Sequence, residues 1–457
     1  MDIDRIASPA SEWLHRLNLP TPSGRLCEAL EVAAEAMRAG CVDVAGLCEA
    51  AAIDGGFYRR HFGGSDEFLV AIAGFLVAEA LRVAVDDFFD GVGEVRTTGE
   101  VAEIISAWLQ QHISESTSGS HQSFATACGV LWEHGGVDIL AKAVEVQSMR
   151  MSFQLREWQG RWMARFDSDE ITRAFLFVAF VSSSWLFSPQ GLSSSLPSLL
   201  RKIAVDTALD GPTRMLRSDS WHPDLRTSAL EVFAPDFGWA AAQLGESRTD
   251  RANDIVSQVA ELWWNDPTRE MGISDICDLF SVSRRTLYAS FGSLEFLVFS
   301  SQAVFTLATV AAYVERLERA RPVASPEKAE RLVSDFIQSF AEPNSSHYRR
   351  LRISAISRRD VLDPEGTLES EFRKLVRRLS TVLRNWQSRN LISQEHHPDA
   401  VAYLFLLHTV SRAIADSTPR HLPDAAWGWE IDILFGGILA TSDDSIFRTS
   451  GEVKLVE

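Results

Sequence analysis

A short run of hydroxyl, guanidinium and phenol side chains is the part of the sequence best suited to contact a polyanion. Ser283 is followed by Arg284, Arg285, Thr286 and Tyr288. A serine hydroxyl can accept a hydrogen bond from a free backbone N–H at a helix start, so Ser283 predicts an N-cap. The two arginines then fall in the first helical turn, where a guanidinium can donate two hydrogen bonds to a guanine edge.

Two short helices must position these residues. A turn at Ser281 and Val282 separates the helix that begins after Ser283 from an earlier one that ends at Phe280. The earlier helix is predicted by apolar residues at helical spacing: Ile273, Ile276, Cys277 and Phe280. Two short helices around a tight turn, with cations at the start of the second, are typical of a helix-turn-helix. Ile255, Val259 and Leu262, also at helical spacing, predict a further helix over residues 251–265.

This stretch resembles the DNA-binding end of TetR-family transcriptional regulators. The resemblance rests on residues in fixed register: Val282, Ser283, Arg284, Arg285, Thr286, Leu287, Tyr288, Phe291, Gly292, Ser293, Glu295 and Leu297. It implies that the second short helix approaches bases and phosphates of duplex DNA, with Tyr288 at a phosphate. It also implies a larger helical lobe that encloses a small apolar effector.

A second copy of the register lies earlier in the chain. Residues 45–69 align with the later stretch without gaps, pairing Cys48 with Cys277 at an offset of 229 (277 − 48). A second match, at an offset of 228, aligns Trp158 with Trp386. A period near half the chain predicts an internal duplication, and the resemblance implies that each half corresponds to one TetR-type subunit.

The first copy carries different chemistry. Asp54 stands where Ser283 stands and is an equally good cap. Gly55 and Gly56 replace the two arginines, which removes base-reading side chains and costs roughly 1 kcal/mol per glycine in helix stability. The basic residues that remain are Arg59, Arg60 and His61. Two interpretations stay open: a vestigial domain kept for packing, or one side of an asymmetric DNA contact.

Two features weaken the predicted DNA contact. Members of the family usually carry a phosphate-binding lysine at the start of the helix that follows the reading helix, and here these positions are Ser65 and Leu294. Both small lobes also hold more acidic than basic residues. Each lost phosphate contact lowers the salt-sensitive part of the affinity, so we expect binding to be weak at physiological salt.

Composition excludes several classes of protein. A formal net charge of −18 argues against a protein that coats nucleic acid through bulk charge. Five cysteines without metal-like spacing indicate a reducing compartment. The N-terminus does not have the pattern of a signal peptide, and the longest apolar runs, residues 68–78 and 175–181, are short for a bilayer. We expect a cytoplasmic protein without membrane contact, cofactor, metal site or catalytic constellation, and therefore not an enzyme.

Helical periodicity without alternating β-branched runs predicts an all-α fold. The expected order is a flexible tail (1–24), a degenerate N-terminal helix-turn-helix domain (25–69), a first helical ligand and dimerisation domain (70–217), a linker (218–247), a second helix-turn-helix domain (248–297), a second helical ligand and dimerisation domain (298–442) and a tail (443–457). The resemblance implies that residues 170–187 with 197–217 pair with residues 399–416 and 424–442 inside the molecule, as a pseudo-dimer. Whether chains also form a homodimer stays open.

The larger lobes are rich in aromatic residues. Candidate ligand-lining residues are Trp108, Trp132, Trp158 and Trp386, and the alternative is plain core. A basic helix face formed by Arg373, Lys374, Arg377 and Arg378 suits solvent, an acidic ligand or pairing with the acidic excess. Two functional hypotheses follow: a one-component regulator that binds duplex DNA, or a helical ligand-sensing or protein-interaction module that has lost DNA binding.

Overall fold

The computed structural model describes most of the chain in separate stretches. These are residues 13, 23–92, 97–114, 119–162, 170–186, 196–205, 235–245, 248–266, 269, 271–320, 323–326, 328–329, 332–333, 355–356, 362–363 and 365–415. All regular elements within these stretches are helices, and none of the described residues belongs to a strand. The all-α prediction is therefore confirmed. The predicted C-terminal tail, the predicted helix over 424–442 and most of the predicted N-terminal tail lie outside the described residues.

The first small lobe contains three helices, α2 (Gly24–Arg38), α3 (Val44–Ala50) and α4 (Gly55–Phe62). A polar side chain caps each of them: Ser23, Asp43 and Asp54 accept hydrogen bonds from the backbone N–H of Leu26, Gly46 and Phe57 respectively. The apolar face of α2 packs against α5 (Ser65–Gly91), which leaves the lobe and descends along the body.

The larger part of the first half is a helical body. It contains α6 (Thr98–Ser114), α7 (Gly119–Glu133), α8 (Val137–Trp162), α9 (Glu170–Leu186) and α10 (Leu196–Val205). Helix α5 packs against α7 and α8, α8 packs against α9, and α6 packs against α10. The long helix α5 thus joins the small lobe directly to the body.

The second half repeats this order. Its small lobe contains α13 (Asp250–Asn265), α14 (Ile273–Phe280) and α15 (Arg284–Phe291), and α16 (Leu294–Arg319) leads into a body with α19 (Thr367–Ser388) and α20 (Pro398–Ala415). Helices α4 and α15 begin 229 residues apart (284 − 55), as do α5 and α16 (294 − 65). The helix bounds therefore recur with the offset seen in the sequence.

One helix lies in the range predicted to be a linker. Helix α12 (Phe237–Leu244) packs against α13 and α16, and the ring of Phe237 is stacked on that of Phe305 with centroids 6.3 Å apart. The predicted linker over 218–247 therefore contains a packed helix in its last part, because an aromatic residue at 237 gains more from burial against α16 than from exposure. Residues 218–234 lie outside the described residues.

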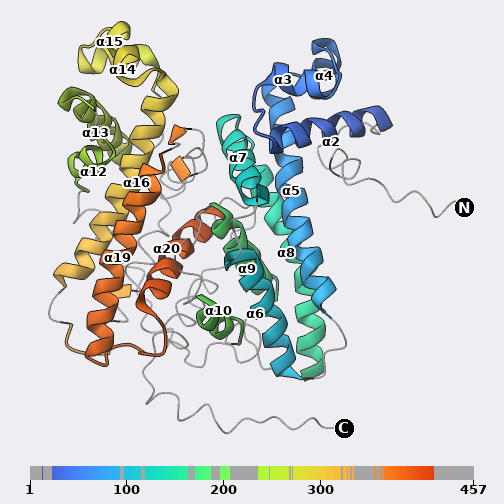
Figure 1. Ribbon diagram of the computed structural model, residues 1–457, viewed down its shortest axis with the longest axis vertical. Coiled ribbons are helices and arrows are strands. Elements are labelled where there is room, and N and C mark those ends of the chain that lie inside the picture. The colour runs from blue at the N-terminus through green and yellow to red at the C-terminus, as the bar shows by residue number, and fades with distance from the viewer. Residues whose placement is uncertain are drawn as a thin grey trace, which may run out of the picture.

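The two small lobes lie at the same end of the molecule. Figure 1 shows α3 and α4 on one side of that end and α14 and α15 on the other, with α5 and α16 descending from them. Farther down, α20 of the second half packs against α9 of the first and also contacts α10. A helix-to-helix contact therefore joins the two halves away from the lobes.

Helices α5 and α16 are long and apolar enough to cross a membrane by length and composition alone. Residues 68–78, the apolar run that is short for a bilayer, lie inside α5, whose apolar character extends over a longer stretch. Most of each helix is covered by other helices, 67% of the apolar window in α5 and 89% in α16. Burial inside the helical body accounts for their composition.

Candidate nucleic-acid interface

The cap at the start of α15 is formed by Ser283. Its Oγ accepts a hydrogen bond from the backbone N–H of Thr286 at 3.1 Å, and the two hydroxyls lie 2.8 Å apart. The turn before it contains Ser281 in the left-handed conformation, with φ of 50°. A capped helix of eight residues is thereby held at a fixed angle to α14, with its first turn at the surface.

The residues predicted to meet DNA face outward on α15. Arg284, Arg285 and Thr286 are exposed, and Tyr288 is 50% exposed. The same helix turns Leu287 inward, where it is buried. Arg284 and Tyr288 are one turn apart and so share a face of the helix. Packing of the apolar face thus leaves the guanidinium, hydroxyl and phenol groups available for a ligand.

Arg284 has a partner that the sequence analysis did not identify. Its Nη2 donates a hydrogen bond of 2.7 Å to Oγ of Ser274, in the first turn of α14. Both side chains are exposed, so the bond directs the guanidinium without burying it. A serine ten residues before an arginine has no periodic relation to it along the chain, and only the fold brings the two together.

A second missed residue, Arg248, lies beneath the reading helix. Its guanidinium sits over the rings of Phe291 at 5.4 Å and Phe296 at 4.7 Å, and it donates a hydrogen bond of 2.8 Å to Oγ of Ser300. Burial lowers the pKa of this arginine. Because Phe291 ends α15 and Phe296 lies in the first turn of α16, Arg248 fastens the reading helix to the long helix.

The first lobe presents a different surface. Asp54 caps α4, with Oδ1 2.6 Å from the backbone nitrogen of Phe57. Phe57 corresponds to Thr286 but is buried, with the Arg25 guanidinium 5.3 Å from its ring centroid and His61 in ring contact at 4.6 Å. His61 is half-buried, whereas Arg59 and Arg60 are exposed. The exposed basic side chains of α4 therefore lie in its last turn, and its first turn carries no arginine.

The aromatic residues proposed as ligand-lining occupy core positions. The ring of Phe88 contacts both Trp108 and Trp158, with centroid distances of 5.6 and 5.7 Å. Nε1 of Trp108 donates to the carbonyl oxygen of Ala84 at 2.6 Å, which satisfies its polar atom inside the body. Trp386 is also buried, in α19, and the side chain of Trp132 lies outside the described part.

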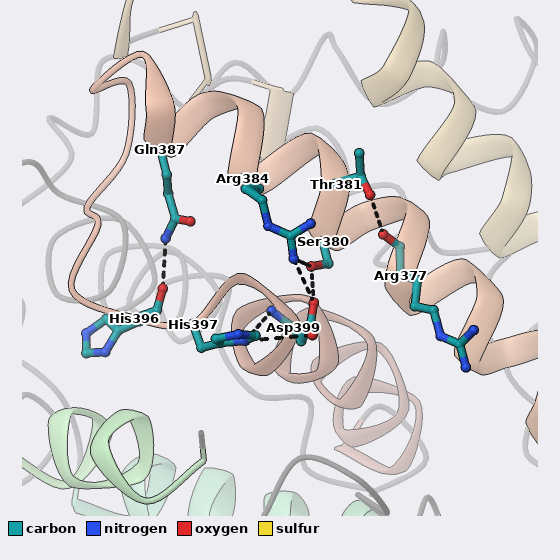
Figure 2. A network of polar contacts seen from close by, with 8 residues as sticks. All are labelled: Arg377, Ser380, Thr381, Arg384, Gln387, His396, His397 and Asp399. Carbon is teal, nitrogen blue, oxygen red and sulfur yellow. Dashed lines mark hydrogen bonds and ion pairs between the residues drawn. The ribbon is translucent and has the colours of Figure 1, made fainter. Parts of the chain in front are cut away.

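The basic face of α19 is largely paired within the molecule. Arg373 bonds Glu369 at 2.5 Å, Lys374 bonds Glu371 at 2.5 Å, and Arg378 reaches Glu318 of α16 at 2.6 Å. Figure 2 shows the end of this helix, where Arg384 lies 3.6 Å from Asp399 of α20. Of the interpretations given for this face, internal pairing is what the structure shows at these positions.

Comparison of the chain with models of protein families, with curated proteins and with solved structures finds no match. Among the residues that the structure describes, no group of His, Cys, Asp and Glu side chains is arranged to hold a metal ion.

Proposed function

We propose that this protein is a TetR-like one-component transcriptional regulator that binds duplex DNA through α15. The observation that carries the proposal is the first turn of α15: a capped helix start with Arg284, Arg285, Thr286 and Tyr288 all exposed. Such a helix suits insertion into the major groove, where arginine selects guanine and hydroxyl groups contact base edges or phosphates.

Two further features support the regulator. The helix bounds repeat at a constant offset, and α9 packs against its counterpart α20, as expected of two TetR-like halves that pair inside one chain as a pseudo-dimer. The long helices α5 and α16 join each small lobe to its body. On this proposal the protein is cytoplasmic, and a small apolar effector in the body changes the positions of the lobes.

The test is a selection from random duplex DNA followed by gel-shift titration over a salt series. Arg284→Ala/Arg285→Ala should lower affinity for the selected duplex by about 30-fold or more, since each good arginine–guanine pair contributes roughly 1–3 kcal/mol and two are removed. Arg319→Ala, an exposed arginine at the far end of α16, is the matched control and should leave the affinity unchanged.

A second function, a helical ligand-sensing or protein-interaction module without DNA binding, is favoured by two surface features. The position of the usual phosphate-binding lysine holds Ser65 in one copy and Leu294 in the other, and α14 exposes Leu279 beside the reading helix. If the parent protein selects no sequence and shifts no duplex at low salt, this second function replaces the first.

A further inference from the structure

We infer that the two lobes contact one duplex by different chemistries: α15 reads base edges, whereas α4 holds phosphates only. The DNA target would then contain one specified half and one half that tolerates any sequence. This inference rests on the proposed function, and deepens it by naming which part of the DNA each lobe recognises.

The reading positions of α4 carry no group that could select a base. Gly55 and Gly56 stand where α15 has its two arginines, and neither offers a donor beyond the backbone. The third position holds Phe57, which is 9% exposed and lies against Arg25. A buried phenyl ring cannot reach into a groove, so the side chains of this turn carry no sequence information.

Three exposed arginines of the first lobe suit phosphates, although the lobe also exposes carboxylates. Arg59 and Arg60 lie in the last turn of α4 and form no ion pair with any described residue, and the guanidinium of Arg59 lies 5.8 Å from the centroid of the Tyr58 ring. Arg25 of α2 adds a third guanidinium, above the Phe57 ring. Arginines placed along a backbone fix register on the duplex and add salt-dependent affinity without selecting a base.

The support for a reading arginine is also missing in the first lobe. Ser274 directs Arg284 in the second lobe through a hydrogen bond of 2.7 Å. The position that corresponds to it at the offset of 229 is Ala45, which has no hydroxyl. Both the reading group and its neighbour therefore differ between the lobes, while the aspartate cap keeps α4 helical.

Contact of both lobes with one duplex requires that they lie at the same end of the molecule. Helices α4 and α15 lie at one end of the molecule, with the bodies of the two halves joined below them (Figure 1). Packing accounts for Arg59 in part, through the Tyr58 ring, whereas Arg60 is exposed and forms no ion pair with any described residue. Phosphate binding by α4 would explain both the glycines at positions 55 and 56 and the exposed Arg59 and Arg60.

The first experiment compares loss-of-function pairs on a selected duplex. Arg59→Ala/Arg60→Ala should weaken binding to selected and scrambled duplexes by the same factor and reduce the salt slope by about 2, one for each phosphate contact. Arg284→Ala/Arg285→Ala should instead reduce the ratio between selected and scrambled duplexes. Circular dichroism checks that each variant keeps its helix content.

The second experiment introduces arginine at the start of α4, where α15 has its two arginines. The backbone at both glycines lies outside the left-handed region, and a Cβ would be 3.6 Å from Tyr58 Cε1 at position 55 and 3.1 Å from Asp54 Oδ1 at position 56. Gly55→Arg/Gly56→Arg should therefore fold. Its selected sequences should show a second block of specified bases, about one helical turn from the first.

The outcomes separate this inference from the proposed function. Two results would overturn the different roles of α4 and α15 while leaving DNA binding intact. One is a parent protein that selects a symmetric sequence, and the other is an Arg59→Ala/Arg60→Ala variant that loses discrimination with an unchanged salt slope. A parent protein that selects no sequence would overturn both the different roles and the proposed DNA binding. If the arginine-bearing variant does not fold, the comparison of the two alanine pairs decides the question.

Discussion

Arg284 depends for its direction on a residue of another helix. The hydrogen bond from its Nη2 to Oγ of Ser274 ties the first turn of α15 to the first turn of α14. An exposed arginine otherwise samples many rotamers, and ordering it on binding costs free energy. A side chain whose conformation is fixed before binding loses less conformational entropy on binding, so Ser274 acts as a positioning residue in the proposed interface.

We expect Ser274→Ala to lower discrimination between selected and scrambled duplexes by about 3- to 10-fold, since one hydrogen bond to a charged group contributes on the order of 1 kcal/mol. Ser274→Thr keeps a hydroxyl and should retain most of the discrimination. Gel-shift titration of both variants checks this. An equal loss in the two would show that the hydroxyl is not the group that matters.

Arg248 supports the same lobe from below. Arg248→Ala removes a guanidinium that contacts two aromatic rings and a buried hydroxyl, so we expect it to destabilise the junction of α15 and α16 by roughly 1–3 kcal/mol. Amide hydrogen exchange over Arg284–Phe291 and the start of α16 measures the loss.

The matched control for Arg248→Ala is Arg251→Ala, an exposed arginine on α13, which should change protection by less than about 0.5 kcal/mol. If both variants lower protection of α15 equally, the contact with the rings does not fasten the helix.

The cap and the first turn of α15 could be predicted from the sequence, but the side chains that support them could not. Ser283 and the arginines after it follow a local rule, because a cap and a first turn are neighbours along the chain. Ser274 and Arg248 act across helix boundaries, through packing that no periodicity encodes. Their contacts follow from the angle between α14 and α15 and from the place where the chain enters α13.

At the scale of elements, the corresponding helices α4 and α15 differ in intrinsic stability. Helix α4 begins with two glycines, whereas α15 begins with two arginines, which are good helix formers. The same cap geometry starts both helices, with Asp54 and Ser283 in extended conformation. Helix α4 is therefore held by its cap and by burial of Phe57 and Tyr58 more than by propensity.

We expect Gly55→Ala to stabilise α4 by about 0.5–1 kcal/mol, because alanine narrows the unfolded ensemble and its Cβ would lie in ordinary contact, 3.6 Å from Cε1 of Tyr58. Gly63→Ala should do the reverse, since Gly63 ends the helix with φ of +98°. Hydrogen exchange of α4 amides follows both. A stabilising Gly63→Ala would contradict the conformational argument.

Helix bounds were more predictable than the limits of domains. The helices over Ile273–Phe280 and from Ser283 onward follow from caps and apolar spacing, and the structure places them at those residues. Helix α12 was missed as an element, because its eight residues lie among prolines, glycines and polar residues. Its helix depends on burial of Phe237 against Phe305 and Trp264, which only the fold supplies.

At the scale of the whole molecule, His396 lies close to where the two halves meet. It belongs to the segment between α19 and α20, is 7% exposed, and neither ring nitrogen has a hydrogen-bond partner among the described residues. Its carbonyl oxygen accepts a hydrogen bond of 2.8 Å from Gln387 (Figure 2). Burial lowers the pKa of His396, Glu395 opposes this, and Lys202 of α10 in the first half adds to it.

We expect His396 to make stability depend on pH in the acidic range. The unfolded chain has an ordinary histidine pKa of about 6.5 and takes up the proton first as the pH falls, because the folded pKa is lower. The contribution of neutral His396 to the free energy of unfolding is therefore complete above pH ~6.5 and is lost as the pH falls below that value. Urea unfolding of the parent and His396→Gln, at several pH values, gives the difference curve.

His397→Gln is the control for His396→Gln, since the side chain of His397 is 53% exposed and lies beside Asp399. A parent and a His396→Gln variant that lose stability in parallel on acidification would show that the buried imidazole does not titrate with unfolding.

The packing of α9 against α20 has a consequence for assembly. Because both helices belong to one polypeptide, the contact forms at a rate and to an extent that do not change on dilution. No exchange of subunits between molecules is needed to create it, so a defective copy cannot enter and inactivate a sound one. In a homodimer one mutation changes both sides of the contact, whereas here a mutation in α9 leaves α20 unchanged. Each half can therefore change independently.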